Sequence, residues 1–218
     1  MMEQRLISMC ILCYIPMLEG QTDSILPWLE TTPEKYGVTP VLLPAVDWNN
    51  DLTPWPAGPI FKKGKSFGGK ADAYLRKLTD EIIPSREADL GVQPEERWLV
   101  GISLSGLFAV WAAVKGGFFH RIAAISGSFW YKDFTAWLEA QPVSPTVRSA
   151  YISLGDKEAE SKNPNLKRIA EETETVVRIL REKGIPTTFE WTDGTHFAPV
   201  APRIEKALNV LRISQSAH

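Results

Sequence analysis

Apolar runs of strand length alternate with segments of helical period along most of the chain. Six runs predict β-strands: 6–15, 38–46, 97–102, 121–126, 150–155 and 187–192. Between them, apolar residues recur at helical spacing and predict amphipathic helices over 71–83, 166–180 and 204–211. Residues 104–114 are apolar on all sides, which predicts a helix that is buried on most of its surface.

This alternation predicts an α/β fold with a mostly parallel sheet and helices on both faces. The 218 residues contain no internal repeat or linker, so we expect a single domain over 1–218. In such a sheet, binding and catalytic residues gather at the carboxyl ends of the strands. Candidate chemistry is therefore sought in the loops that follow the predicted strands.

The net charge and the first residues indicate which partners and which cellular location to expect. The formal net charge of −2 gives no reason to expect nucleic acid or an anionic membrane as a partner. The first 17 residues contain an apolar run, but Glu3 precedes it, no small-residue cleavage site follows, and the run is too short to span a bilayer. We interpret it as a buried first strand of a cytoplasmic protein, in which Cys10 and Cys13 are two buried structural thiols.

The stretch GPIFKKGKS, residues 58–66, imitates a phosphate-binding loop. That motif needs four residues between its two glycines, whereas five separate Gly58 from Gly64. A proline-rich stretch, and not a strand, precedes it. We interpret it as a solvated loop with a basic tip. No dinucleotide fingerprint or metal-ligand pattern is present either, so neither a cofactor nor a metal is expected.

The clearest chemical signal is GISLSG, residues 101–106, between a predicted strand and a predicted helix. A nucleophile elbow has the pattern G-x-S-x-G in this context, because small neighbours let the serine occupy a tight, strained turn. Gly101 and Ser103 match, but Ser105 stands where the last glycine belongs. Serine is small enough to replace that glycine, so Ser103 is the candidate nucleophile. A turn of small residues without chemistry is the alternative.

A serine nucleophile needs a base. Of the three histidines, His218 is the last residue and His120 precedes a strand, at the wrong edge of the sheet. His196 follows the last predicted strand, on the same side as Ser103, and is the candidate base. Its alternative role is that of a turn residue or helix cap.

An acid is expected between Ser103 and His196 in the chain, because triads on this kind of sheet follow the order serine, acid, histidine. The charged segment after the strand at 150–155 offers Asp156 and Glu158, with Glu160 a more distant third. Glu158 is favoured, since the acid commonly lies three residues beyond the glycine that closes its strand. A solvated acidic turn is the alternative.

The chain resembles the esterase branch of the α/β-hydrolases, which contains enterochelin (siderophore) esterases, feruloyl esterases and S-formylglutathione hydrolase. The resemblance is carried by VDWNNDLTPWPA (46–57), GISLSGLFAVWAA (101–113), IAAISGSFWY (122–131), SLGDKEAESKNP (153–164) and DGTHF (193–197). It covers most of the chain beyond about residue 35 and implies a hydrolase sheet that lacks its first strands. It also implies hydrolysis of a carboxylic ester, with Ser103 and His196 at the matching catalytic positions.

An oxyanion hole would use the backbone N–H of Leu104, the residue after the nucleophile, and a second N–H from the loop after the first strand, where we choose Leu18. Among the aromatic residues that follow strands, Trp48 and Trp130 are expected to line the pocket. The hypothesis is a cofactor-free serine esterase acting on a small-molecule ester, with no prediction of oligomeric state. An acyltransferase with the same nucleophile and a non-catalytic binding protein on this scaffold are the alternatives.

Overall fold

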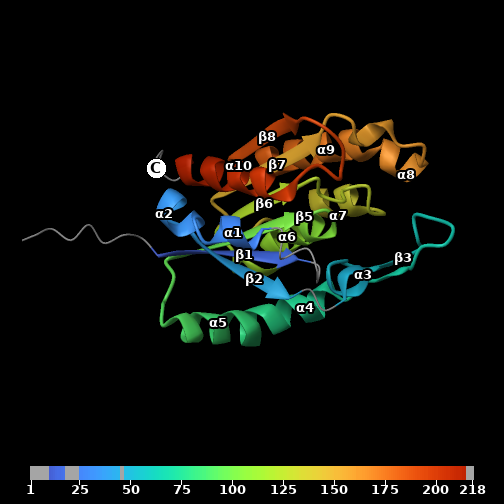
Figure 1. Cartoon of the computed structure of the whole chain (residues 1–218). Helices are drawn as coiled ribbons and strands as arrows, with labels where there is room; N and C mark the ends of the chain where they lie inside the picture. Colours follow the sequence, from blue (N-terminus) through green and yellow to red (C-terminus); the bar gives the residue numbers. More distant parts are fainter. Residues whose placement is uncertain (1–9, 18–24, 45–46, 215–218) are drawn as a thin grey trace, which may run out of the picture.

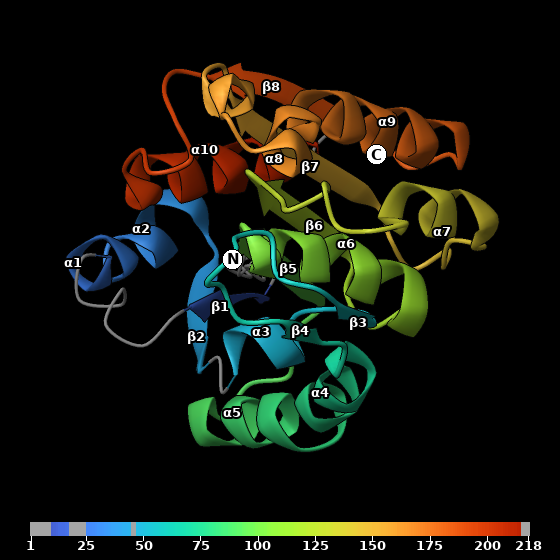
Figure 2. The ribbon, with the colours of Figure 1, turned by 90° about the vertical axis from the view of Figure 1, so that its right-hand side faces the viewer.

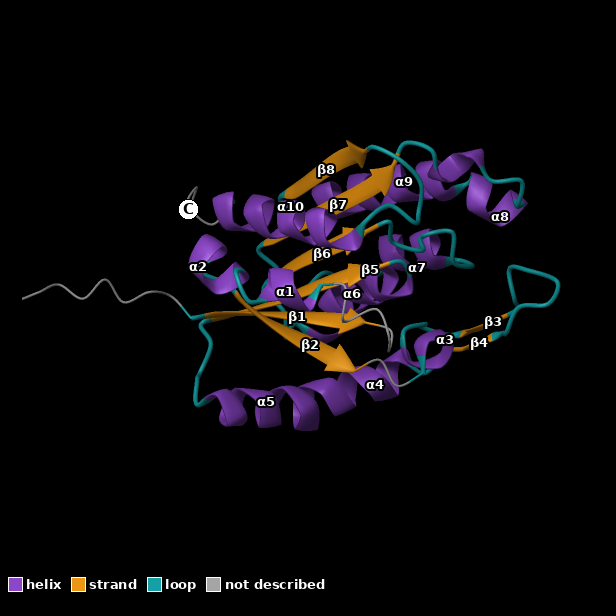
Figure 3. Cartoon of the chain, in the orientation of Figure 1, coloured by secondary structure: helices purple, strands orange, loops and turns teal. Residues whose placement is uncertain are grey.

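The computed structural model describes residues 10–17, 25–44 and 47–214. Its main sheet has six strands in the order β2-β1-β5-β6-β7-β8, and every neighbouring pair is parallel. The strands are β1 (Ile11–Met17), β2 (Thr39–Pro44), β5 (Glu96–Ile102), β6 (Arg121–Ile125), β7 (Ser149–Gly155) and β8 (Thr187–Thr192). All six therefore end at the same edge of the sheet (Figure 3).

Helices cover both faces of the sheet (Figure 2). The longer ones are α4 (Ala71–Lys77), α5 (Ile83–Leu90), α6 (Leu104–Gly116), α7 (Phe134–Ala140), α9 (Ile169–Glu182) and α10 (Val200–Ile213). The shorter ones are α1 (Leu26–Leu29), α2 (Thr32–Tyr36), α3 (Trp48–Asp51) and α8 (Pro164–Lys167). Apolar residues of α4, α6 and α9 form one core layer, and those of α10 form the other. The predicted α/β fold, with a parallel sheet between two helical layers, is confirmed.

The predicted helix at 104–114 is α6, and each residue from Leu104 to Val114 is buried. The helix predicted at 71–83 runs further and is not uniform, because a π-helical turn, Leu78–Ile82, separates α4 from α5. Pro84 lies in the first turn of α5 and has no N–H to donate, which favours a widened turn before it. Strand β1 also differs from the run 6–15, since it extends through Pro16 to Met17; residues 6–9 lie outside the described part.

A small antiparallel hairpin, β3 (Pro56–Ala57) and β4 (Phe67–Gly68), extends beyond the carboxyl ends of the main strands (Figure 1). Its base is fixed to the body by Trp55, whose carbonyl accepts from the Tyr131 hydroxyl at 2.5 Å and whose indole N–H donates to the Lys132 carbonyl at 3.0 Å. Residues 61–66, which contain three lysines, are exposed at its tip. The stretch that imitates a phosphate-binding loop is thus a solvated basic loop, as predicted.

The two cysteines do not share the environment that we expected. Cys13 is fully buried in β1, but Cys10 precedes the strand and is only partly buried, because the chain has not yet entered the sheet there. Both thiols are free. None of the helices in the described ranges combines the length and the apolar character that crossing a membrane requires.

Candidate active site

Ser103 lies at the sharp turn between β5 and α6, at the carboxyl edge of the sheet. Its backbone angles, φ 58° and ψ −121°, are unusual for a non-glycine residue. The turn needs glycine at 101, because a Cβ there would lie 2.0 Å from the backbone oxygen of Ser105. The sequence GISLSG thus forms the strained strand-to-helix turn that the elbow pattern predicts.

Ser105, the residue that departs from that pattern, is used by the turn itself. It is fully buried, its Oγ accepts from the Ile102 N–H at 2.7 Å, and its hydroxyl donates to the Ile102 carbonyl at 2.9 Å. These bonds close the turn from inside. Of the two hydroxyls in GISLSG, Ser103 alone lines the cleft described below.

His196 lies in the loop between β8 and α10 and faces Ser103. Its Nε2 is 3.1 Å from Ser103 Oγ, and its Nδ1 is 2.8 Å from Glu158 Oε2. The His196 side chain is 36% exposed, whereas that of Glu158 is 4% exposed. The serine, the imidazole and the carboxylate therefore form one continuous hydrogen-bonded line that runs from the cleft into the protein.

Glu158 is held as a carboxylate. It begins the short 3₁₀ turn Glu158–Glu160 after β7, and its Oε1 accepts from the Gly155 N–H at 2.9 Å and from the Ser126 hydroxyl. Burial alone would raise the pKa of this carboxyl, but hydrogen bonds from His196, Ser126 and Gly155 outweigh burial and lower it. An ionised partner at Nδ1 is what keeps the proton-accepting lone pair of the imidazole on Nε2.

Asp156, the other candidate acid, has a different task. It is exposed, and its Oδ1 accepts from the Gly194 N–H at 2.8 Å, which holds the loop that carries His196. Glu160 is exposed as well. The structure therefore brings Glu158 into contact with His196, whereas Asp156 contacts the loop that carries His196.

A cleft of about 580 Å³ opens at this edge of the sheet, and Ser103, Glu158 and His196 line it. Both tryptophans chosen from the sequence line it too, together with other aromatic side chains: Trp48, Phe61, Phe67, Trp130 and Phe197. Leu104 lines it at the start of α6, where the first N–H groups of a helix have no partner within the helix. Leu18, the other predicted N–H donor, lies outside the described residues.

Three polar residues near Ser103 were not singled out from the sequence. Ser128 lines the cleft with its Oγ 3.3 Å from Ser103 Oγ, and Ser126, the residue after β6, contacts Glu158. The motif SGSFWY that contains both was visible, but nothing in it tells which hydroxyls face the site. Arg203 of α10 lies behind Glu158, and its place in an amphipathic helix gave no signal at all.

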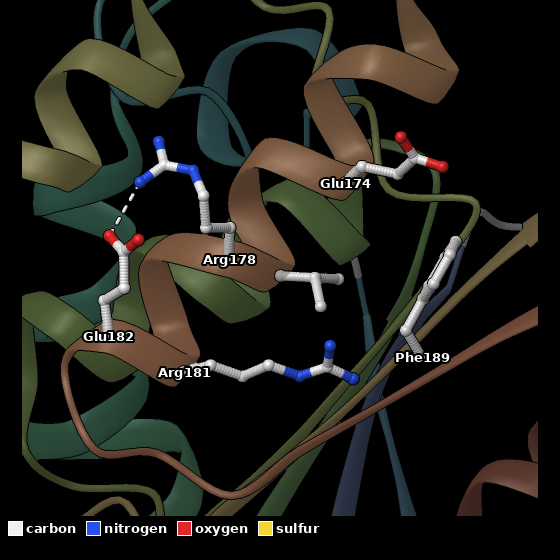
Figure 4. Close-up of a pocket in the computed structure, with 6 residues that line it drawn as sticks. Glu174, Arg178, Arg181, Glu182 and Phe189 are labelled. Atoms are coloured by element: carbon white, nitrogen blue, oxygen red, sulfur yellow. Dashed lines mark hydrogen bonds and ion pairs between the residues drawn. The ribbon is translucent and has the colours of Figure 1, made fainter.

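A second hollow, of about 290 Å³, lies between α9 and β8 (Figure 4). Three of its charged groups are already engaged: Arg178 Nη1 donates to Glu182 at 2.6 Å, and Arg181 donates twice to the Thr187 carbonyl. Neither a serine nor a histidine lines it. In the described ranges, no three His, Cys, Asp or Glu side chains gather as the ligands of a metal ion would.

Comparisons with solved structures agree with this fold. An IroE-like serine hydrolase from Shewanella oneidensis superposes with a TM-score of 0.75 at 16% identity, covering 94% of this chain and 71% of that one. The siderophore hydrolase EstA from Aspergillus nidulans gives a TM-score of 0.67 at 18% identity, covering 94% of this chain and 83% of that one. At these identities both matches concern the fold alone, which is the α/β-hydrolase fold.

Sequence comparison goes further. The chain is 31% identical over 138 residues to the uncharacterized protein YbbA of Bacillus subtilis (strain 168), and this alignment spans 62% of the chain and 55% of that protein. The family described as Putative esterase matches residues 25–198, which include the elbow, the acid turn and the histidine loop. Because this match takes in well over half of its length, the chain belongs to the Putative esterase family, a family of ester hydrolases.

Proposed function

We propose that the protein is a serine esterase in which Ser103 is the nucleophile, His196 the general base and Glu158 the acid that orients it. The observation that carries this proposal is the line of two contacts, 3.1 Å from Ser103 Oγ to His196 Nε2 and 2.8 Å from His196 Nδ1 to Glu158 Oε2. The strained backbone of Ser103 is the second support, because an elbow exposes its serine to a substrate.

In the proposed reaction, Ser103 Oγ attacks the ester carbonyl while His196 Nε2 takes its proton. The N–H of Leu104 donates to the oxyanion that forms, from the start of α6. The imidazolium then gives its proton to the departing alcohol, and an acyl group remains on Ser103. His196 next removes a proton from water, which attacks the acyl carbonyl and releases the acid.

The lining of the cleft supports an ester that carries an aromatic ring. Five aromatic side chains surround the opening, and ring–ring contacts hold several of them in place: Phe67 lies 5.9 Å from Trp130 between ring centroids, and His196 lies 5.6 Å from Phe197. Phe197 is 91% exposed in the free protein. Covering it with a substrate ring would remove apolar surface from water.

The test compares two serines of one turn. Ser103→Ala and Ser105→Gly are exposed to a fluorophosphonate probe and to p-nitrophenyl esters with acetyl and aromatic acyl groups. We expect Ser103→Ala to lose labelling and turnover, whereas Ser105→Gly, which restores the usual elbow glycine, keeps both. Turnover that persists in Ser103→Ala would refute the nucleophile.

The same assay separates the alternatives. Labelling without hydrolysis, followed by ester exchange when an alcohol is added, would indicate an acyltransferase. An absence of both labelling and hydrolysis in the unmodified protein would favour a binding protein. Siderophore and feruloyl esters belong in the panel, because solved relatives include a siderophore hydrolase and a ferulic acid esterase.

A further inference from the structure

A buried arginine lies on the far side of Glu158 from His196. Arg203 comes from α10, its side chain is 7% exposed, and one of its guanidinium nitrogens, Nη2, is 3.6 Å from Glu158 Oε1. The same nitrogen donates to Ser126 Oγ, and the Ser126 hydroxyl donates in turn to Glu158 Oε1. A cation, a hydroxyl and the carboxylate therefore lie in sequence behind the candidate triad.

Ser126 is held in a conformation that favours this relay. It follows β6 with φ 48°, a left-handed backbone that is uncommon for serine, and its N–H donates to the Ser153 carbonyl at 2.8 Å. The strained backbone aims a short side chain between α10 and the acid turn. Because Ser126 and Gly155 both donate to Oε1 of Glu158, the other carboxylate oxygen, Oε2, is available to His196.

Arg203 is an expensive residue to bury. Its Nε and Nη1 atoms are buried without a hydrogen-bond partner in the part of the chain that the structure describes. Burial lowers the pKa of its guanidinium, which the charge of Glu158 partly offsets. A buried ion pair with unsatisfied donors is often no better for stability than apolar residues of the same size. Its stabilising value therefore does not explain this arginine well.

We propose that Arg203, acting through Ser126, is a positioning residue that keeps Glu158 ionised with Oε2 directed at His196 and lowers the proton affinity of the Glu158–His196 pair. This inference rests on the proposed function, in which His196 must be neutral to accept a proton from Ser103.

The charges around the pair make the sign of the effect clear. Glu158 faces His196 on one side and Arg203 on the other, and Ser126, which follows β6 and contacts Glu158, is neutral. On its own far side, Arg203 is near Tyr151, whose hydroxyl donates to Glu190 at 2.8 Å.

Removing the cation raises the affinity of the pair for a proton, whichever of the two groups takes it. The acidic limb of kcat/KM should then move to higher pH, because a larger fraction of His196 is already protonated.

The experiment titrates His196 by NMR and records kcat/KM against pH for the unmodified protein, Arg203→Met, Arg203→Lys and Ser126→Ala. The His196 resonance is assigned by its loss in His196→Gln. His120, whose Nδ1 accepts from the Arg97 N–H at the opposite edge of the sheet, serves as the internal reference. Arg203→Met should move the acidic limb of kcat/KM to higher pH by about one unit, the lower end of the effect of a charge that lies 3.6 Å from a carboxylate, and the midpoint of the His196 resonance should move in the same direction.

Arg203→Lys keeps the charge and should restore most of the original profile, while Ser126→Ala should give a smaller upward shift. A role of Arg203 in stability alone predicts lower melting temperatures with unchanged titrations in all variants, and that result would overturn the proposal. If Arg203→Met does not fold, Ser126→Ala decides: a shift supports the relay and an unchanged pKa overturns it. A shift of His196 in a protein without esterase activity would refute the proposed function and keep the relay.

Discussion

Replacing Glu158 by glutamine tests the acid assignment, and the structure sets the size of the effect. Glu158 Oε2 lies 2.8 Å from His196 Nδ1, so a full positive charge formed on His196 would lie about 4 Å from the carboxylate charge. At an effective dielectric constant of about 20, that pair is worth about 4 kcal/mol, or about 10³-fold in rate. His196 is 36% exposed, so water screens part of this attraction.

A second effect works in the opposite direction to that screening. The amide of glutamine can present its NH₂ to Nδ1 and favour the wrong imidazole tautomer, which in a comparable triad contributes to a loss of about 10⁴-fold. We therefore expect Glu158→Gln to lower kcat by about 10³-fold with little change in KM. The acidic limb should also move to lower pH, because the imidazolium form of His196 loses the anion that stabilises it.

Asp156→Asn is the matched control. An asparagine there keeps an oxygen that can accept from the Gly194 N–H, so kcat should stay within a few-fold of the original. Both variants are assayed for steady-state hydrolysis of p-nitrophenyl esters and for the rate of fluorophosphonate labelling. The acid assignment is refuted if Glu158→Gln retains a tenth or more of kcat, or if Asp156→Asn falls equally far.

Three further changes test the scaffold and the cleft. Gly101→Ala would place a Cβ 2.0 Å from a backbone oxygen of α6, so we expect an unfolding free energy lower by about 3 kcal/mol or more, measured by urea denaturation. The Glu96 carboxyl is fully buried; burial raises its pKa, but hydrogen bonds from Arg121 and Trp98 lower it more. Because the pKa of Glu96 is lower in the folded than in the unfolded protein, its contribution to stability is present above the unfolded pKa. That contribution is lost as the pH falls through the folded pKa. Arg121→Met should cost about 3 kcal/mol at neutral pH and move acid unfolding to higher pH, as followed by circular dichroism; an unchanged acid midpoint would contradict this. Trp130→Ala should raise KM for an aromatic ester and leave that for an acetyl ester nearly unchanged, and equal effects on both would remove Trp130 from substrate binding.

Much of the fold was predictable because the central strands are buried on both faces. Runs such as 97–102 and 121–126 are apolar apart from their terminal residues, and the observed strands start and end within one residue of them. Short elements left no comparable pattern: β3 and β4 have two residues each, and α1 has four. Their existence depends on tertiary contacts, for example those of Trp55, that no local period reveals.

Some residues of the candidate site were predictable from the sequence, and others were not. Ser103 and His196 could be chosen because each follows a strand, and all parallel strands end at one edge. Asp156 and Glu158 could not be separated with the same force, since both follow Gly155 within three residues and only the path of the 3₁₀ turn decides which one reaches His196. Arg203 was beyond prediction because its partner, Glu158, is 45 positions away in the chain (203 − 158) and in a loop.

The position of β8 has a consequence for how the protein loses activity. Ser103 lies between a central strand and a buried helix, whereas His196 lies in the loop after β8, an edge strand whose one partner among the described strands is β7. Local opening of β8 and the loop after it would separate the imidazole from Oγ while the rest of the sheet stays closed. Mild denaturant should therefore abolish hydrolysis before the core amides begin to exchange with solvent, and dilution should restore it without a refolding delay.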